Sequence, residues 1–385
     1  MYQITRILDY AMIKVLSLLP IKENWIVLHS LPDYSDNARV FYDYLIKENY
    51  NKDFKIIWLV KDPSKYKPEP NVVFARNDGD SNLPLGKRDY YVSRAKWVVF
   101  THRTPLGKWR KKQVFIHTTH SASQLKGAGK VMPKTKWRSA PTFKMRCGQD
   151  GLEKAMKRTG LPEERFLVLG MPRLDLLFEH KDCLSLLFPQ KKYKKVFMVM
   201  ETFRQAREFA DSSFESSFGL NLIRDEAELK RLDDYLAQND SLMIIKPHPM
   251  QIISKIHMQS LKNICFIQNS DIDAKGIQLY ELLENCDALL TDYSSIYYDF
   301  LLLDRPIGFM VSDMEEYSRG FIIDDPLGEM PGMKMTDLNG LEEFISSVIN
   351  GIDDYKEQRK YMKDRTFKYQ DNQNSKRLID YIKLH

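Results

Sequence analysis

The stretch that decides the fold reads LLTDYSSIYYDFLLLDRPIGFM and occupies residues 289–310. An apolar run ends at Thr291 and Asp292, a short polar turn follows, and a second apolar run comes next, which predicts a strand, a turn and a helix. A helix that begins at Ser294 or Ser295 directs its free backbone N–H groups and its positive dipole end at the turn. Such a turn suits a phosphate, and an ordinary capped helix of an α/β protein fits the same residues equally well.

The composition predicts a folded chain of two domains. The chain has 385 residues, 43% of them hydrophobic, which exceeds the size of one ordinary core. Lysine and arginine (58) outnumber aspartate and glutamate (52), and the net charge of +6 favours anionic partners without indicating a nucleic-acid-binding protein. The four cysteines are far apart and form no Cys-x-x-Cys pair, so we expect a reduced, cytosolic setting and no structural metal.

The N-terminal segment, residues 1–20, has apolar residues at helical spacing and ends at Pro20, which predicts an amphipathic helix. The sequence contains no run of about 18 apolar residues, so no transmembrane helix is expected. The segment also lacks the long apolar core and the cleavage site of a signal peptide. Two alternatives stay open: the helix lies in a membrane interface, or it docks on its own domain.

Residues 21–185 alternate short apolar runs with amphipathic segments, and they are predicted to form a first Rossmann-like α/β domain. Two of its predicted strands lead into loops that carry histidine. Because ligands of parallel sheets gather beyond the carboxyl ends of the strands, these loops are candidate site elements. The predicted strands are 25–29, 54–60, 71–75, 97–101, 113–117 and 166–170, and the predicted helices are 37–47 and 87–95.

A second α/β pattern covers residues 190–350, after a leucine-rich and basic stretch at 178–195 that is interpreted as a linker. Helices within residues 353–385, the first at 353–369, are able to cross back to the first domain. The two patterns predict two Rossmann-like domains that face each other across a cleft. No Gly-x-Gly-x-x-Gly follows the first strand and no P-loop sequence occurs, which argues against a dehydrogenase or a P-loop NTPase. The predicted strands are 196–200, 242–245, 264–267, 288–290 and 306–310, and the predicted helices are 227–238, 279–284, 296–303 and 341–349.

Three predicted loops combine side chains that suit a phosphate-rich ligand. One holds His120 and Lys126, one holds Lys246 and His248, and the third is the hydroxyl-rich turn at 291–295. An imidazole in the first loop suits a general base, and a polar surface group is the ordinary alternative. The second imidazole lies between two prolines, which fix the backbone and suit either a placed side chain or a plain turn.

Two further motifs are weaker candidates for a functional site. His117 lies at the end of a predicted strand and is the competing candidate for a general base. The sequence Asp-Ile-Asp at 271–273 is typical of some metal sites, but it follows Gln-Asn-Ser and is interpreted as a solvated polar loop.

The order of these motifs resembles that of the CDP-glycerol glycerophosphotransferase family, whose enzymes prime and polymerise teichoic-acid and related capsular chains. The resemblance runs from about residue 25 to the C-terminus and rests on the ordered set rather than on any one motif. The motifs are KPHP at 246–249, LTDYSS at 290–295, DRPI at 304–307, GMPRLD at 170–175, ETFR at 201–204 and the acidic-to-Pro-Gly stretch at 324–332.

The resemblance implies a GT-B architecture, a peripheral position on the cytoplasmic face of a bacterial membrane, and no metal or cofactor. It implies transfer of a polyol phosphate, with glycerol phosphate as the first expectation, from a CDP-polyol to a hydroxyl of a lipid-linked acceptor in teichoic-acid or capsule synthesis, with release of CMP. His120 is the expected general base and His248 a second catalytic residue. The residues expected at the donor phosphates are Arg204, Lys246, Thr291, Asp292, Ser294 and Ser295, and further expected site residues are Ser121, Lys126, Arg173 and Asp324.

The chain departs from the family pattern after His120. The family has glycine where this chain has Ser121, and the following Leu-Lys pair, which ends at Lys126, lies about one residue further on. Glycine permits positive φ and close approach of the backbone to a ligand, which serine does not. The alternatives to a CDP-glycerol enzyme are a CDP-ribitol-using transferase, a GT-B nucleotide-sugar glycosyltransferase and an inactive nucleotide- or polymer-binding membrane protein.

Overall fold

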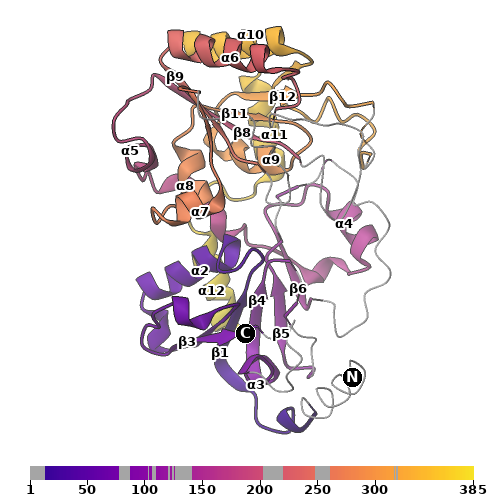
Figure 1. Ribbon diagram of the computed structural model, residues 1–385. Helices are drawn as coiled ribbons and strands as arrows, with labels where there is room; N and C mark the ends of the chain where they lie inside the picture. The colour runs from indigo at the N-terminus through magenta and orange to yellow at the C-terminus, as the bar shows by residue number, and fades with distance from the viewer. Residues whose placement is uncertain are drawn as a thin grey trace, which may run out of the picture. The chain divides into compact units, whose positions relative to one another are not determined.

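The protein forms two compact units, each built on a parallel sheet (Figure 1). Unit 1 comprises Met1–Ala122, Val131–Asp175 and Phe367–His385, and unit 2 comprises Ser123–Lys130 and Leu176–Thr366. The chain therefore returns to unit 1 at its C-terminal end. The computed structural model describes residues 14–77, 87–102, 104–105, 110–119, 122–123, 125, 141–202, 220–247, 261–315, 317 and 320–385.

Unit 1 contains a seven-stranded sheet in the order β3-β2-β1-β4-β5-β6-β7, with every neighbouring pair parallel. The central strands are buried on both faces, which explains their nearly continuous apolar sequences. The strands are β1 (Lys22–His29), β2 (Lys55–Val60), β3 (Val72–Arg76), β4 (Ala95–Phe100), β5 (Val114–His117), β6 (Phe143–Arg146) and β7 (Phe166–Val168). The helices are α2 (Asp36–Lys47), α3 (Lys87–Arg94), α4 (Leu152–Thr159) and α12 (Asn374–Leu384), with 3-10 turns at Tyr50–Lys52, Pro63–Lys65 and Glu163–Arg165. A further 3-10 turn, Pro172–Phe178, begins in unit 1 and ends in unit 2.

The C-terminal helix α12 belongs to the core of unit 1. Its apolar residues Leu378, Ile379 and Ile382 are buried in the same cluster as Phe41 of α2 and Trp58 of β2. A second cluster, which includes residues of α3, covers the opposite face of the sheet. The end of the chain therefore completes the first unit rather than the second.

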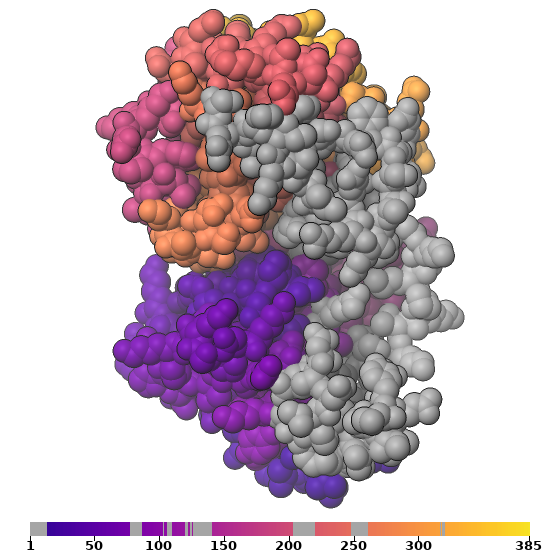
Figure 2. All heavy atoms as spheres, viewed as in Figure 1, coloured from indigo at the N-terminus to yellow at the C-terminus, as the bar shows by residue number. Residues whose placement is uncertain are grey.

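Unit 2 contains a six-stranded parallel sheet in the order β10-β9-β8-β11-β12-β13. Helices α6 and α10 pack on one face of it, and in the space-filling view α6 forms part of the outer surface of the unit (Figure 2). The strands are β8 (Lys195–Met200), β9 (Ser241–Ile245), β10 (Ile264–Phe266), β11 (Ala288–Thr291), β12 (Ile307–Met310) and β13 (Met333–Met335). The helices are α5 (Cys183–Leu187), α6 (Glu226–Gln238), α7 (Asn269–Asp273), α8 (Leu279–Glu284), α9 (Ile296–Phe300) with the 3-10 turn Leu301–Leu303, α10 (Leu338–Asn350) and α11 (Lys356–Thr366).

The predicted α/β class is confirmed, and most of the predicted strands lie where the sequence indicated. Three predictions about single elements are wrong. The Asp-Ile-Asp stretch is not a loop but part of helix α7, where the carboxylate of Asp271 accepts a hydrogen bond from the Gln268 amide in a capping box. The helix expected at 353–369 ends at Thr366, and the linker expected at 178–195 contains α5.

Thirteen residues of the predicted N-terminal helix, 1–13, lie outside the described residues. The part that follows is helical at residues 14–16 and ends before Pro20. Among the helices of the described residues, none is long and apolar enough to cross a lipid bilayer.

Candidate active site

In each sheet the strand order reverses direction at one point, and there the loops at the carboxyl edge separate and leave room for a ligand. The reversal lies between β1 and β4 in unit 1 and between β8 and β11 in unit 2. The loops that leave these four strands are therefore the places where the fold positions functional side chains.

The reversal point of unit 2 is held together by Asp292, which follows β11 and is completely buried. Its Oδ1 accepts hydrogen bonds from the Thr202 amide (2.9 Å), the Thr202 hydroxyl (3.0 Å) and the Ser294 amide (2.9 Å). The neighbouring Thr291 hydroxyl donates to the Met200 carbonyl at 2.6 Å. The ETFR and LTDYSS motifs therefore bind each other, and Thr291 and Asp292 shape the turn.

Two serines follow this turn and are partly exposed. Helix α9 begins at Ile296, and Ser295 occupies its N-cap position without a side-chain capping bond. Within the described part of the chain, no hydrogen bond is formed by the hydroxyl of Ser294 or Ser295. These hydroxyls are therefore oriented by a rigid turn and are suited to contact a ligand.

Lys246 follows β9, the strand next to β8, and only 5% of it is exposed. Its amide donates to the Val199 carbonyl at 2.9 Å, which fixes the backbone at the edge of the sheet. Burial lowers the pKa of the Lys246 ammonium, and the carboxylate of Asp273 opposes that shift. A buried ammonium is stable only beside negative charge, so this position favours an anionic ligand such as a phosphate.

In unit 1 the loop that leads to His120 is tied to helix α2. The Asn37 side chain is completely buried, donates to the Thr119 carbonyl (2.9 Å) and accepts from the Arg173 amide (3.1 Å). Thr119 itself has a φ of 57°, which is unusual for a β-branched residue. Strained backbone of this kind persists where the surroundings enforce it, which is common beside functional groups.

Arg173 of the GMPRLD motif belongs to the same network. Its side chain is 4% exposed, and its Nη1 lies 3.0 Å from Oδ1 of Asp36 in an ion pair. Two residues later, Asp175 accepts hydrogen bonds from the backbone amides of Asn374 and Ser375, both at 2.9 Å. The motif therefore connects helix α2 with the start of α12.

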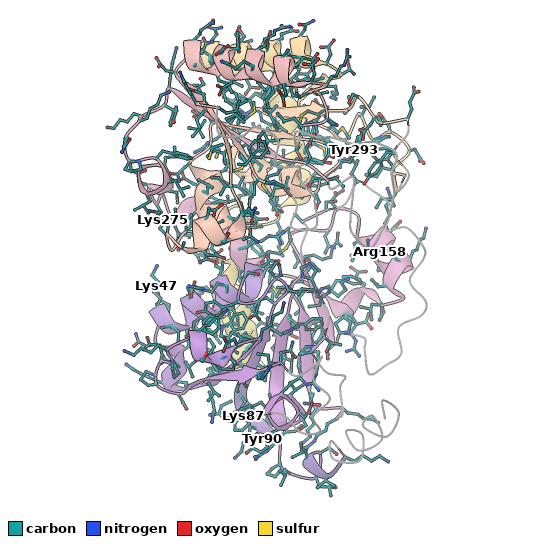
Figure 3. All side chains as sticks on the ribbon, in the orientation of Figure 1. Lys47, Lys87, Tyr90, Arg158, Lys275 and Tyr293 are labelled. Atoms are coloured by element: carbon teal, nitrogen blue, oxygen red, sulfur yellow. The ribbon has the colours of Figure 1, made fainter. Side chains whose placement is uncertain are left out.

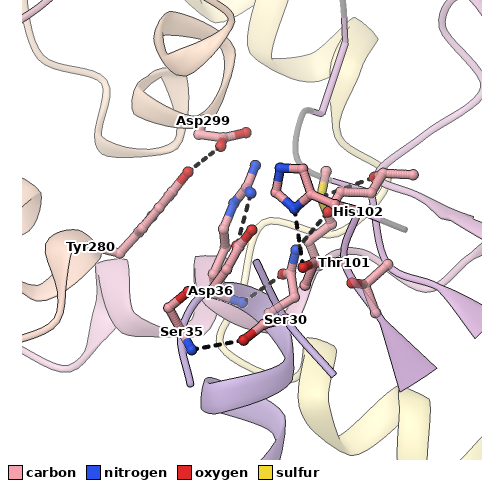
Figure 4. A network of polar contacts seen from close by, with 12 residues as sticks. Ser30, Ser35, Asp36, Thr101, His102, Tyr280 and Asp299 are labelled. Atoms are coloured by element: carbon pink, nitrogen blue, oxygen red, sulfur yellow. Dashed lines mark hydrogen bonds and ion pairs between the residues drawn. The ribbon is translucent and has the colours of Figure 1, made fainter. Parts of the chain in front are cut away.

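His102 lies at the reversal point of unit 1, in the loop after β4, and was not ranked among the candidates from sequence (Figure 4). Its Nδ1 lies 3.2 Å from the Thr101 hydroxyl, which itself accepts a hydrogen bond from the Leu31 amide of the loop after β1. Partial burial lowers the pKa of His102, Asp36 opposes that shift and Arg173 adds to it. The strand order would have singled out this histidine, and the sequence does not reveal that order.

The competing histidine, His117, is held by packing. Its ring stacks on Phe100 with centroids 5.0 Å apart, and its Nε2 contacts the Thr101 carbonyl. Asp324 is exposed, and no hydrogen bond or ion pair joins its side chain to another described residue. The remaining candidates lie outside the described residues, so the structure does not test them; they are His120, Ser121, Lys126, Arg204 and His248.

The described residues contain no group of three or more His, Cys, Asp or Glu side chains that could hold a metal ion. The four cysteines are free thiols, and three of them are buried.

Two parallel α/β units, each with polar loops at the carboxyl edge of its sheet, define a GT-B-like protein. Its fold matches that of the wall teichoic acid polymerase TagF with a TM-score of 0.74 and 23% identity, over 94% of this chain and 89% of the other. The family model described as CDP-Glycerol:Poly(glycerophosphate) glycerophosphotransferase matches residues 11–384. The chain therefore belongs to this family of transferases.

Curated relatives agree with this assignment. The chain is 25% identical to a teichoic acid glycerol-phosphate transferase of Staphylococcus aureus, over 97% of this chain and 96% of the relative. It is 24% identical to the teichoic acid ribitol-phosphate polymerase TarK of the same species, over 96% of this chain and 70% of the relative. It spans 60% and 48% of two further staphylococcal polymerases, one named for ribitol phosphate and the other for glycerol phosphate.

Proposed function

We propose that this protein transfers a polyol phosphate from a CDP-polyol to a hydroxyl group of a lipid-linked acceptor and releases CMP, in the synthesis of a teichoic-acid or capsule-type polymer. The main support is the carboxyl edge of the unit 2 sheet, because buried Lys246 and the turn shaped by Asp292 are suited to bind a pyrophosphate. Membership of the glycerophosphotransferase family supports the reaction class. In this proposal residues 190–350 bind the donor, and residues 21–185 bind the acceptor and supply the base.

The reaction is a displacement at phosphorus. The acceptor hydroxyl attacks the distal phosphorus of the CDP-polyol, a new P–O bond forms, and the bond from that phosphorus to the oxygen of CMP breaks. His120 takes the hydroxyl proton, for which an imidazole pKa of about 6.5 is well matched. CMP leaves as a phosphate monoester whose second pKa is about 6, so the leaving group needs little help from an acid.

The larger demand is to hold and neutralise the pyrophosphate, because phosphoryl transfer depends mainly on positioning and electrostatics. Lys246 supplies a buried positive charge, and His248 and Arg204 are proposed to add donors. The hydroxyls of Ser294 and Ser295 are proposed to bind the donor directly, whereas Thr291 and Asp292 hold the turn beneath them. Arg173 is proposed to position the first-domain loop through Asn37.

Glycerol phosphate is the first candidate for the transferred group, and ribitol phosphate is the second because relatives named for both are about equally similar. We place the protein peripherally on the cytoplasmic face of the membrane. Exposed Val15 (64%) and Leu18 (83%) support this location, and Arg110 fixes the segment by donating to the Leu16 carbonyl at 3.1 Å. Deletion of residues 1–19 should reduce sedimentation with liposomes, and undiminished sedimentation would show that the anchor lies elsewhere.

The function is tested by incubating the protein with CDP-glycerol, CDP-ribitol or a UDP-sugar together with a lipid-like acceptor, and measuring release of CMP or UDP. CMP release that depends on the acceptor is expected. UDP release would instead favour a glycosyltransferase, and tight CDP binding without turnover of any donor would favour an inactive binding protein. His120→Ala should abolish transfer and spare donor affinity, whereas His248→Ala should weaken donor binding as well.

A further inference from the structure

Positive charge is concentrated in one part of the chain. Residues 90–149 contain fourteen lysines and arginines and no aspartate or glutamate, whereas the whole chain has a net charge of +6. The rest of the chain is therefore net negative. Such a separation of charge is typical of a surface that binds an anionic partner.

Strand β6 carries two of these cations at the carboxyl edge of the unit 1 sheet. Lys144 and Arg146 are two residues apart, so their side chains lie on the same face of the strand. Lys144 is in register with His117 of β5 on one side and Phe166 of β7 on the other. It therefore lies beside the end of β5, from which the chain runs on to His120.

Helix α4 adds a third cation, Arg158, which projects from the helix that follows β6 (Figure 3). Its positive charge acts on both Lys144 and Arg146. Burial, followed by the charges of Arg158 and Arg146, lowers the pKa of Lys144 to about 8. The charged groups that act on this lysine are thus cations, and no ion pair links it to another described residue.

The position of Arg146 is fixed by backbone acceptors and an aromatic ring. Its Nε donates to the Gly148 carbonyl at 3.2 Å, its Nη2 contacts the Asp150 carbonyl, and its guanidinium lies 6.0 Å from the centre of the Phe166 ring. These contacts orient the guanidinium, and the carboxylate of Asp150 offsets part of its positive charge. Gathering partly buried cations is unfavourable unless an anion joins them.

We propose that Lys144, Arg146 and Arg158 form an anion-binding subsite for a phosphodiester group of the acceptor chain. The inference rests on the proposed function, because an acceptor that already carries polyol phosphates presents such groups near the hydroxyl that reacts. A phosphodiester bears one negative charge and two free oxygens, which two or three converging cations can bind. The side chains are partly buried at a strand end, which suits a slender polymer better than the flat surface of a membrane.

The first test measures binding without turnover, by calorimetry with a soluble glycerol-phosphate oligomer and the full chain. Lys144→Gln and Arg158→Gln should each weaken binding about fivefold or more and reduce its dependence on salt. Lys144→Arg should retain most of the affinity, since it keeps the charge. Lys154→Gln is the matched control, because Lys154 is an exposed lysine of the same helix and should change nothing.

The second test separates this subsite from the donor site and from a lipid surface. In a transfer assay Lys144→Gln should raise KM for the acceptor and leave KM for the CDP-polyol unchanged. Loss of binding to phosphatidylglycerol vesicles with unchanged oligomer binding would show that the cluster serves lipid head groups, which would overturn the proposal. Oligomer binding that depends on Lys144 in a protein without transfer activity would support the subsite and refute only the proposed function.

Discussion

The two units hold the loops at the carboxyl edges of their sheets in different ways. In unit 2, Asp292 ties together two loops that leave adjacent strands, and it does so through Thr202. In unit 1, the loop before His120 is held by a residue of a helix: Asn37 of α2 binds the Thr119 carbonyl and the Arg173 amide, and Asp175 of the same GMPRLD motif binds the start of α12. The edge proposed to bind the donor (the donor edge) is therefore held by direct bonds between the loops of two adjacent strands, whereas the edge proposed to bind the acceptor (the acceptor edge) depends also on helices α2 and α12.

The largest effect is expected where unit 1 is joined to its last helix. Gly170 has a φ of +79°, and a Cβ at this position would lie 1.7 Å from Oδ1 of Asn374, so Gly170→Ala should displace α12. We expect a loss of about 3 kcal/mol or more in the free energy of unfolding by urea. Gly160→Ala is the graded control, because φ is +67° there but no atom lies within 4 Å.

The Gly160→Ala control should cost only about 1–2 kcal/mol, the backbone strain alone. If the two variants were equally stable, contact with α12 would contribute nothing, and unit 1 would not depend on its last helix.

The next effect concerns the donor edge. Asp292→Ala leaves two backbone amides and one hydroxyl without their acceptor, at a cost of about 2–4 kcal/mol in stability. Because the turn then loses its shape, affinity for CDP measured by calorimetry should fall about tenfold or more. Thr202→Val removes only the hydroxyl bond and should have a clearly smaller effect. Unchanged CDP affinity in Asp292→Ala would mean that the turn does not form the donor site.

The acceptor edge is tested by removing one hydrogen-bond donor, the side-chain N–H group of Asn37. Asn37→Asp retains an acceptor for the Arg173 amide but loses the N–H group that binds the Thr119 carbonyl. We expect kcat to fall about tenfold, the effect of a base displaced by a fraction of an ångström, with KM for the CDP-polyol nearly unchanged.

The matched control for this variant is Asn51→Asp. It removes a similar bond, to the Pro70 carbonyl at 2.9 Å, at the far edge of the same sheet. An equal loss of kcat in both variants would exclude a special role for the Thr119 contact.

The fold was largely predictable because buried parallel strands leave a plain apolar signal, as in β2 (KIIWLV) and β8 (KVFMVM). The elements that escaped prediction are short and polar. Strand β6 reads FKMR and β13 reads MKM, and neither has enough apolar residues in sequence to stand out from a loop.

The candidate site was predictable only in part. Motifs marked Asp292 and the serines after it, but which loop the carboxylate binds depends on the strand order. Asn37 reads as an ordinary residue at the start of a helix, and only the fold brings it to Thr119. Motif analysis marked Arg173, which binds Asn37, but it could not mark Asn37, which belongs to no motif.

The smallest predicted effect belongs to His102, at the reversal point of unit 1. Its pKa is lowered from 6.5, so the folded state binds fewer protons than the unfolded state, and stability is lost as the pH falls through about 6.5. His102→Gln removes this penalty, so urea unfolding between pH 5 and 7 should show a smaller pH dependence, by about 0.5 kcal/mol or less for a partly exposed group. A variant as acid-sensitive as the wild type would show that His102 is not desolvated in the folded protein, and the reversal point of unit 1 would then be as open to water as an ordinary surface loop.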